Sequence, residues 1–452
     1  MGKPPHLSQT TESEATERRG RFQLPPAFRY PAYRAYWLGT LASVSGFQML
    51  NFGQFWLVFE LTESPLYLGY VGAANAISAI TLNLFGGVYA DKLDKRRLII
   101  ITQLITAALI FLLAFLTVTG VVAVWHILAI AFVTGAVNAF DQPARQALYP
   151  HLIERSAMVS AVALNSAIWQ GTRIFAPAVA GVIIASLGTS STFFIAGAGF
   201  AIMSMVIFWL HVPYIETSTG NALKNMADGL KFIKSDSVFW FLIGMTFFNS
   251  FFGMAYISMM PAITVDVLNL GADSQGTLMS IGGIGAFSMT MLLGSKTNFR
   301  HKGLLIIGGG AVFGLSVAGF AITAHYFSSF PIAAGFMIVM GMSSSIYMIS
   351  IMSSLQLLVP DHMRGRVMGF YGMTWSIMPL SATQAGAVAS FTSVPFAIAI
   401  GGFLVASFAL GPALVNKKVR NVGALLMQAE QALETRSQTE NRSQPAHASG
   451  DD

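Results

Sequence analysis

The sequence contains no cysteine among its 452 residues. This absence excludes disulfide bonds, thiolate metal sites and cysteine nucleophiles, because each of them requires a thiol. A phosphate-binding loop of the Walker type is absent too, since the glycine-rich run "GGGAVFG" (308–314) lacks the lysine that such a loop needs. No His or carboxylate cluster with metal-ligand spacing lies within an apolar segment. We therefore expect no metal site, no cofactor, no ATP hydrolysis and no enzymatic activity.

Charged residues are scarce as well. They make up 10% of the chain, whereas 54% of the residues are hydrophobic and the mean hydropathy is +0.61. A soluble protein of this length cannot bury so much apolar surface, because its water-facing positions need polar cover. Apolar runs recur along the chain, and they reach the length of roughly 20 residues that a helix needs to cross a bilayer. The composition predicts a polytopic membrane protein, in which a net charge of +6 does not indicate nucleic-acid binding.

The apolar runs and the breaks between them predict an all-α protein with twelve transmembrane helices. These helices are expected near residues 36–60, 66–89, 98–118, 121–142, 158–187, 191–211, 238–264, 274–294, 303–324, 330–354, 367–391 and 394–415. If they alternate in direction, the Lys and Arg residues between the helices all fall on one side of the membrane. The other side has no Lys or Arg but four acidic residues, Glu60, Glu63, Asp266 and Asp273. By the positive-inside rule, both termini are predicted to be cytoplasmic.

The chain is predicted to consist of two six-helix bundles. The expected parts are a cytoplasmic tail (1–33), a first bundle (34–211), a cytoplasmic loop (212–237), a second bundle (238–415) and a cytoplasmic tail (416–452). The segments "QALYPHLIERSAM" (146–158) and "QLLVPDHMRGRVM" (356–368) share Gln, Leu, Pro and Met at a constant offset of 210. Weak symmetry between two halves is typical of secondary transporters, whose substrate site lies between the halves near the membrane midplane.

Much of the scarce charge is concentrated in one short loop, within "LFGGVYADKLDKRRLII" (84–100). The pattern Gly87-x-x-x-Asp91-Lys92-x-Asp94-Lys95-Arg96-Arg97 resembles the loop between the second and third helices of the major facilitator superfamily. Four further segments resemble the branch that contains bacterial enterobactin, macrolide and drug exporters. They are "FDQPARQALYPHLI" (140–153), "RIFAPAVAG" (173–181), "MADGLKFIKS" (226–235) and "VPDHMRGRVMG" (359–369).

This resemblance covers about residues 28–415 and carries expectations about function. It implies the major facilitator fold, in the cytoplasmic membrane of a bacterium. It also implies a monomeric secondary transporter that exports an amphiphilic small molecule, such as a drug or siderophore, by alternating access coupled to protons. The residues alone leave three alternatives open: a flippase for lipids or lysolipids, a sensor on a transporter fold, and a solute importer.

The resemblance also implies that Asp91 joins the two halves on the cytoplasmic side while the transporter faces outward. Gly87 lets helices approach closely, and Asp91 can accept hydrogen bonds from arginines. Asp141 and Arg145 have the i,i+4 spacing of a pair on one helix face, and the resemblance implies that Arg145 lies near Asp91. The residues assigned to this gate are Gly87, Asp91, Lys92, Lys95, Arg96, Asp141, Arg145, Arg364 and Arg366. The alternatives are local pairing at the helix end for Asp141 and Arg145, and topogenic charge in contact with anionic membrane lipids for the loop cations.

Arg173 lies inside a predicted helix, about 22 Å from its start at 1.5 Å per residue. A charge at this depth is costly unless it is paired or hydrated, so it indicates a functional role. No carboxylate lies at the same depth, which leaves three possibilities: contact with an anionic or polar substrate, hydrogen bonds to carbonyls and polar side chains between helices, or a coupling role. The residues assigned to substrate or coupling are Arg173, Gln48, Asn51, Asn165, Gln170 and Asn249.

Overall fold

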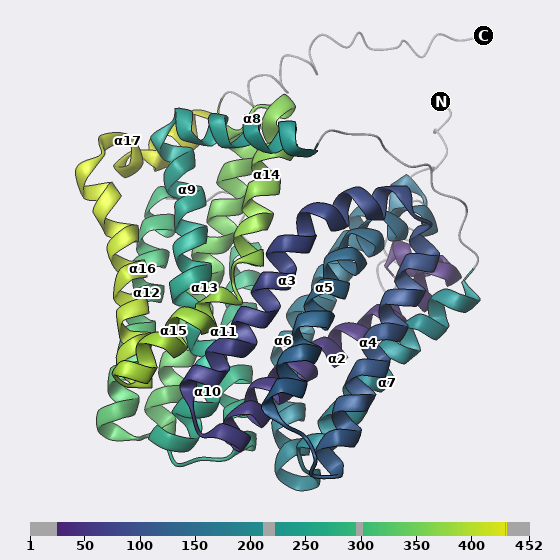
Figure 1. Cartoon of the computed structure of the whole chain (residues 1–452). Coiled ribbons are helices and arrows are strands. Elements are labelled where there is room, and N and C mark those ends of the chain that lie inside the picture. The colour runs from purple at the N-terminus through teal and green to yellow at the C-terminus, as the bar shows by residue number, and fades with distance from the viewer. Residues whose placement is uncertain (1–24, 211–221, 295–301, 430, 432–452) are drawn as a thin grey trace, which may run out of the picture.

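The computed structural model describes residues 25–210, 222–294, 302–429 and 431. The side chains of residues 83–92, 222–226, 302 and 361 lie outside this description. In the described ranges the regular structure is entirely helical. Long helices run between two ends of the molecule, and α8 (Ala222–Ser235) lies across one of them, the upper end in Figure 1.

Six long helices form the N-terminal half. They are α2 (Pro31–Thr62), α3 (Pro65–Lys92), α4 (Lys95–Val118), α5 (Val124–Leu148), α6 (Met158–Leu187) and α7 (Thr189–Trp209). Helix α3 packs against α5, α4 against α5 and α7, and α2 against α6 and α7. The helix starts follow local chemistry: the Asp94 carboxylate caps α4 by accepting from the backbone amide of Arg97 at 3.0 Å.

The C-terminal half contains more and shorter elements. They are α9 (Ser237–Phe248), the π-helical turn η4 (Asn249–Gly253), α10 (Ala255–Ala262), the π-helical turn η5 (Ile263–Val267), α11 (Ala272–Gly294), α12 (Lys302–Phe327), α13 (Phe330–Leu358), α14 (Asp361–Ser376), α15 (Leu380–Phe391), α16 (Val394–Val415) and α17 (Lys417–Arg420). Helix α12 packs against α13 and α16, α11 against α13, and α15 against α16. Helix α8 rests on α14 and α9, so the predicted loop 212–237 contains a helix docked on this half.

Most predicted helices appear with small changes in their ends, and the predictions 158–187 and 394–415 match α6 and α16 at both ends. Ten helical segments of the described chain are long and apolar enough to cross a membrane. One of them, Ser237–Val267, combines α9, η4, α10 and η5. The first predicted span is filled by α2, which is not among the ten. The count of twelve spans therefore stays a prediction.

The prediction of one helix over 367–391 is wrong. Helix α14 ends at Ser376, and α15 begins at Leu380. Pro379 stands between them and caps α15. Proline has no backbone N–H to donate, and its ring clashes with the preceding helical turn, so Pro379 favours a break here, whereas α6 continues through Pro177. The apolar composition of the segment continues through the break, which hid it from the sequence pattern.

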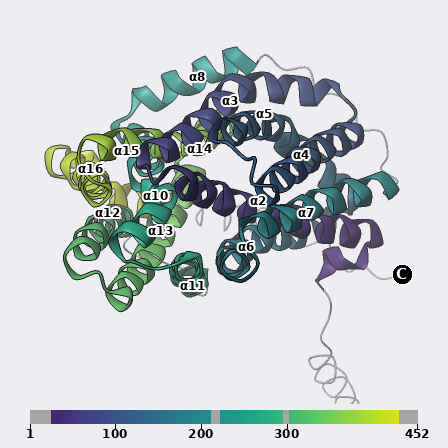
Figure 2. The ribbon, with the colours of Figure 1, turned by 60° about the horizontal axis from the view of Figure 1, so that its bottom comes forward.

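The two halves meet along two pairs of helices, α3 with α15 and α6 with α11 (Figure 2). Both contacts bring backbones together at glycines. A Cβ on Gly72 would overlap the carbonyl oxygen of Pro379, and a Cβ on Gly276 would overlap that of Pro177. Such close approach is typical of small residues at membrane helix interfaces. The contacts lie near the start of α3 and in the second half of α6, toward the end of the molecule opposite α8.

This geometry makes Gly276→Leu a test of the contact between the halves. The added side chain should force α6 away from α11 and expose Ala272, which is 3% exposed. Because the chain has no cysteine, Ala272→Cys gives a single reporter thiol. We expect Gly276→Leu to raise its reaction rate with a polar thiol reagent about ten-fold, a population shift of ~1.4 kcal/mol.

Gly335→Leu is the matched control, since a Cβ at Gly335 meets nothing within 4 Å. It should leave the thiol reactivity unchanged. Equal reactivity in all three proteins would contradict the packing described for α6 and α11.

Candidate functional site

Arg173 lies between the two halves. Its side chain is exposed, whereas its neighbours Thr172 and Ile174 are buried. Its carbonyl oxygen is 3.4 Å from where a Cβ on Gly283 of α11 would lie. Its charge acts on the hydroxyls of Tyr256 in α10 and Tyr347 in α13. The guanidinium of the N-terminal half thus faces the C-terminal half.

No hydrogen bond or ion pair to the Arg173 side chain occurs among the described residues. The polar residues expected at similar depth do not supply one. The Asn51 amide donates to the carbonyl oxygen of Phe47 in its own helix at 2.9 Å. Gln48 and Gln170 are half-buried and make no side-chain hydrogen bond in the described part of the chain. The site therefore presents an unneutralised cation to whatever enters between the halves.

Asn249 lies in the C-terminal half as the first residue of the π-helical turn η4. Its side chain is 0% exposed, and neither its Oδ1 nor its Nδ2 has a hydrogen-bond partner in the described structure. A Cβ on Gly253 would lie 2.8 Å from Asn249 Oδ1, so the turn closes tightly over the amide. Leaving a buried amide unpaired is destabilising, and π-helical turns are frequent at functional sites. These two features keep Asn249 among the candidates.

Asn249→Leu tests this interpretation. Leucine has nearly the same size and removes two unpaired polar atoms, so we expect it to raise the free energy of unfolding by about 1–3 kcal/mol. Transport should fall at the same time if the amide serves function. Asn51→Leu is the control, because it removes an amide that is hydrogen-bonded. Loss of stability in Asn249→Leu, measured by thermal unfolding in nanodiscs, would refute the idea of an unsatisfied amide.

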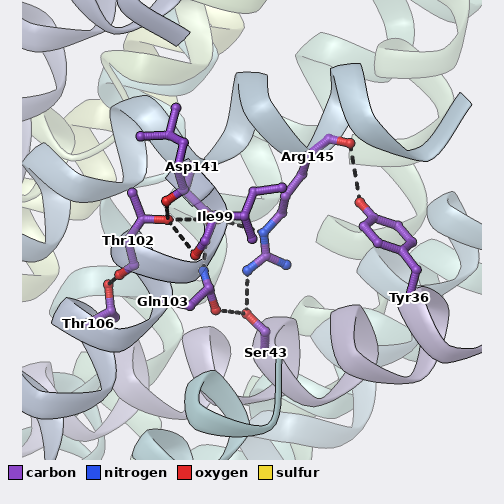
Figure 3. Close-up of polar contacts among 9 residues, drawn as sticks. Tyr36, Ser43, Ile99, Thr102, Gln103, Thr106, Asp141 and Arg145 are labelled. Carbon is purple, nitrogen blue, oxygen red and sulfur yellow. Dashed lines mark hydrogen bonds and ion pairs between the residues drawn. The ribbon is translucent and has the colours of Figure 1, made fainter. Parts of the chain in front are cut away.

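Asp141 and Arg145 form the predicted pair on α5, and both are buried (Figure 3). Arg145 Nε lies 2.6 Å from Asp141 Oδ2. This contact is not aligned as a hydrogen bond, so the attraction is chiefly between the charges. Asp141 Oδ1 accepts hydrogen bonds from Thr102 Oγ1 at 2.9 Å and from Gln103 Nε2 at 3.0 Å. The carboxylate thus ties α5 to α4.

Arg145 extends the network to α2. Its Nη2 donates to Ser43 Oγ at 2.7 Å, and the Ser43 hydroxyl donates to Gln103 Oε1 at 3.0 Å. The Tyr36 hydroxyl donates to the carbonyl oxygen of Arg145 at 3.3 Å. Helices α2, α4 and α5 are therefore joined by one buried polar network inside the N-terminal half. The sequence predicted the pair but missed Ser43, Thr102 and Gln103, because ordinary Ser, Thr and Gln residues in apolar helices carry no pattern that marks them.

The remaining gate residues fall into two groups. Gly87, Asp91 and Lys92 lie in the last turns of α3, and their side chains are outside the described residues, so the expected contact of Asp91 with Arg145 stays a prediction. Arg96 donates from Nε to the carbonyl oxygen of Ile207 at 3.2 Å and from Nη2 to that of Phe208. It satisfies two carbonyls at the end of α7, inside its own half. Lys95, beside it, is 5% exposed.

On the C-terminal half, Arg366 of α14 pairs with Asp228 of α8 at 3.1 Å, and both side chains are more than a third exposed. A Cβ on Gly229 would lie 3.2 Å from Arg366 Cβ, so α8 lies directly over α14. Arg364, two residues earlier, is exposed. The sequence pointed to Arg366 but gave no indication of Asp228, 138 positions away.

The buried Asp141–Arg145 pair and the partly exposed Arg366–Asp228 pair should contribute differently to the free energy of unfolding. Removing one partner of a buried pair leaves an unpaired buried charge, so Asp141→Ala and Arg145→Ala should each lower the free energy of unfolding by about 3–5 kcal/mol. The double variant should lose less than the sum. Arg366→Ala, in a partly exposed pair, should lose about 1 kcal/mol or less. Thermal unfolding of the four variants measures these differences, and an Arg145→Ala variant as stable as Arg366→Ala would contradict the network.

Among the described residues, no three His, Cys, Asp or Glu side chains are grouped so that they could hold a metal ion. The described chain is all-helical with ten candidate membrane spans, and comparison with known proteins identifies it as a transporter of the major facilitator superfamily, a class without enzymatic activity. Residues 24–444 match the model of the family described as transmembrane secretion effector, and the chain belongs to this family. The resemblance drawn from the motifs is thereby confirmed.

Relatives support the same class. The chain is 25% identical over 375 residues to the staphyloferrin A transporter of Staphylococcus aureus (strain NCTC 8325 / PS 47), covering 81% of this chain and 91% of that protein. It is 22% identical over 398 residues to macrolide efflux protein A of Streptococcus pyogenes, covering 84% and 95%. Among solved structures, it resembles a bacterial homolog of the human lysosomal transporter Spinster in an inward-facing, unoccupied conformation. That likeness has a TM-score of 0.66 at 13% identity, covers 88% of this chain and 98% of that chain, and shows the fold.

Proposed function

We propose that this protein is a secondary active transporter that exports an amphiphilic small molecule across the cytoplasmic membrane of a bacterium. The observation that carries the proposal is Arg173, a charge on a membrane-spanning helix that faces the opposite half without a partner among the described residues. An intramembrane charge is retained where it serves transport or is neutralised by cargo. A cargo with an anionic or strongly polar group would supply the partner for the Arg173 guanidinium that the described residues do not.

The contacts between the halves support alternating access. They lie toward the end opposite α8. The positive-inside rule makes the α8 end cytoplasmic, since α8, α14 and α17 carry Lys and Arg there. This orientation supports the proposal of an inward-facing state, in which cargo enters from the cytoplasm. The solved relative named above as inward-facing has the same fold.

Proton entry is the proposed driving force, since the resemblance to bacterial exporters implies coupling to protons. We further propose that the protein works as a monomer, with the cations at the α8 end in contact with anionic lipids.

Export from a pump-deficient bacterial host tests the proposal. Cells expressing the wild type should accumulate less of an amphiphilic cargo than cells without it, and a protonophore should abolish the difference. A panel of cationic, neutral and anionic amphiphiles identifies the cargo. Arg173→Ala should lose anionic or polar cargo at least ten-fold, because a lost charge-assisted contact is worth about 1.5–3 kcal/mol.

Arg155→Ala is the matched control, since Arg155 is an exposed arginine in the turn before α6. It should export like the wild type. If no compound moves and the protonophore changes nothing, energised export is refuted. Lipid scrambling in liposomes would then test the flippase alternative.

A further inference from the structure

A second polar site lies in the N-terminal half, closer to the α8 end than Arg173. It is a pocket of about 70 Å³ between α2, α5 and α6. A water molecule needs about 10–15 Å³ by this measure, so the pocket has room for several waters or for a small polar group of a ligand. Its lining belongs to one half alone, so it does not depend on the contact between the halves.

Three of the eight lining residues carry side-chain amides. Gln142 and Gln146 of α5 and Asn165 of α6 all face the pocket. Asn165 Oδ1 is buried and has no hydrogen-bond partner in the described part of the chain. Gln142 and Gln146 likewise make no side-chain hydrogen bond within the described residues. Each amide offers both donors and an acceptor, so the pocket presents paired donors and acceptors that the protein itself leaves unused.

The pocket is close to electrically neutral. Of the described residues in its lining, Arg145 alone is charged, and Asp141 balances that charge at 2.6 Å. A fixed anion would have to compete with the Asp141 carboxylate for the guanidinium. A cation would meet the guanidinium at close range. The electrostatics therefore favour an uncharged ligand group over either ion.

Trp169 completes the wall with an aromatic ring. Phe47 of α2 lies edge-on to it with the ring centroids 6.3 Å apart, which holds the indole in place. A fixed ring beside several amides suits a group with C–H surface on one side and hydroxyls or amides on the other. Polyhydroxyl rings and amide-rich groups have this chemistry.

Asn165, Trp169 and Arg173 follow one another at intervals of four on α6, so they lie along one face of the helix. Asn165 and Arg173 are separated by about 12 Å along the axis at 1.5 Å per residue. The pocket and Arg173 thus lie at successive depths along one face of α6, with the pocket nearer the α8 end.

We infer that this pocket binds an uncharged, hydroxyl- or amide-rich end of an amphiphilic ligand through Gln142, Gln146 and Asn165, before the ligand reaches Arg173. The inference deepens the proposed function and rests on it, because the ligand is taken to be the cargo. It assigns the pocket a ligand class of its own, distinct from the anionic or polar group expected at Arg173.

Three probes with the same alkyl tail separate the head-group classes: decyl glucoside, decyl sulfate and decyltrimethylammonium. Their binding to the full chain in nanodiscs is measured below micellar concentrations and without a proton gradient, against empty nanodiscs. We expect Gln142→Leu and Asn165→Leu each to weaken binding of decyl glucoside about ten-fold, since each removes one or two hydrogen bonds. The affinities of both variants for decyl sulfate and decyltrimethylammonium should stay within two-fold of the wild-type values.

Gln356→Leu is the matched control, because Gln356 is the counterpart of Gln146 at the internal offset of 210 and is exposed on α13. It should leave all three affinities unchanged, and thermal unfolding verifies that each variant folds. The inference is overturned if the pocket variants weaken all three probes equally, if they weaken decyl sulfate most, or if they weaken none. Because no gradient is used, selective binding without export in cells would leave the pocket inference standing and count against the proposed function alone.

Discussion

The close contact between the two halves at one end of the molecule is the constraint on which the rest of the structure depends. It is made by backbone against backbone, at glycines where any Cβ would overlap a carbonyl oxygen of the other half. In a bilayer, apolar side chains gain little by leaving lipid for protein, so tight packing of small residues is a principal source of helix association. Packing of this kind is strong only while the helix backbones are in contact, and it is lost as soon as the helices separate. The contact of α3 with α15 and of α6 with α11 can therefore be either closed or open.

Burying an unpaired charge costs free energy, and the charged residues around the contact between the halves are placed accordingly. Asp141 and Arg145 are buried, but they neutralise each other and are tied to α4 and α2 by hydrogen bonds. Arg366 and Asp228 lie at the α8 end, where water can reach them. Arg173 differs from both, since it lies between the halves with no partner among the described residues. Structural charges are thus paired or solvated, while the cation left unbalanced faces the proposed path of the cargo.

Much of the fold could be predicted because apolar length is a direct physical signal. The ends of α6 and α16 were predicted to the residue, and the motif loop identified the superfamily. The break at Pro379 was missed because the surrounding apolar run masks it. The two π-helical turns in the seventh predicted span were missed because an extra residue in a helical turn leaves hydropathy unchanged. Arg173 could be singled out because a charge stands out in an apolar helix, and its role at a substrate site stays a prediction. The site was not predictable where neutral side chains 40 or more positions apart meet, as at Ser43 and Gln103.

The most direct test of the account is a pair of distances across the halves, one at each end of the molecule. The cysteine-free chain allows spin labels at His151→Cys and His362→Cys near the α8 end, and at Val121→Cys and Phe391→Cys near the opposite end; all four positions are exposed. Pulsed electron paramagnetic resonance in proteoliposomes then reports both distances with and without a proton gradient. The account predicts that a second population appears in which the α8-end distance shortens and the opposite distance lengthens together. Distances that stay fixed at both ends, or that change at one end alone, would contradict a transporter whose two ends open and close in alternation.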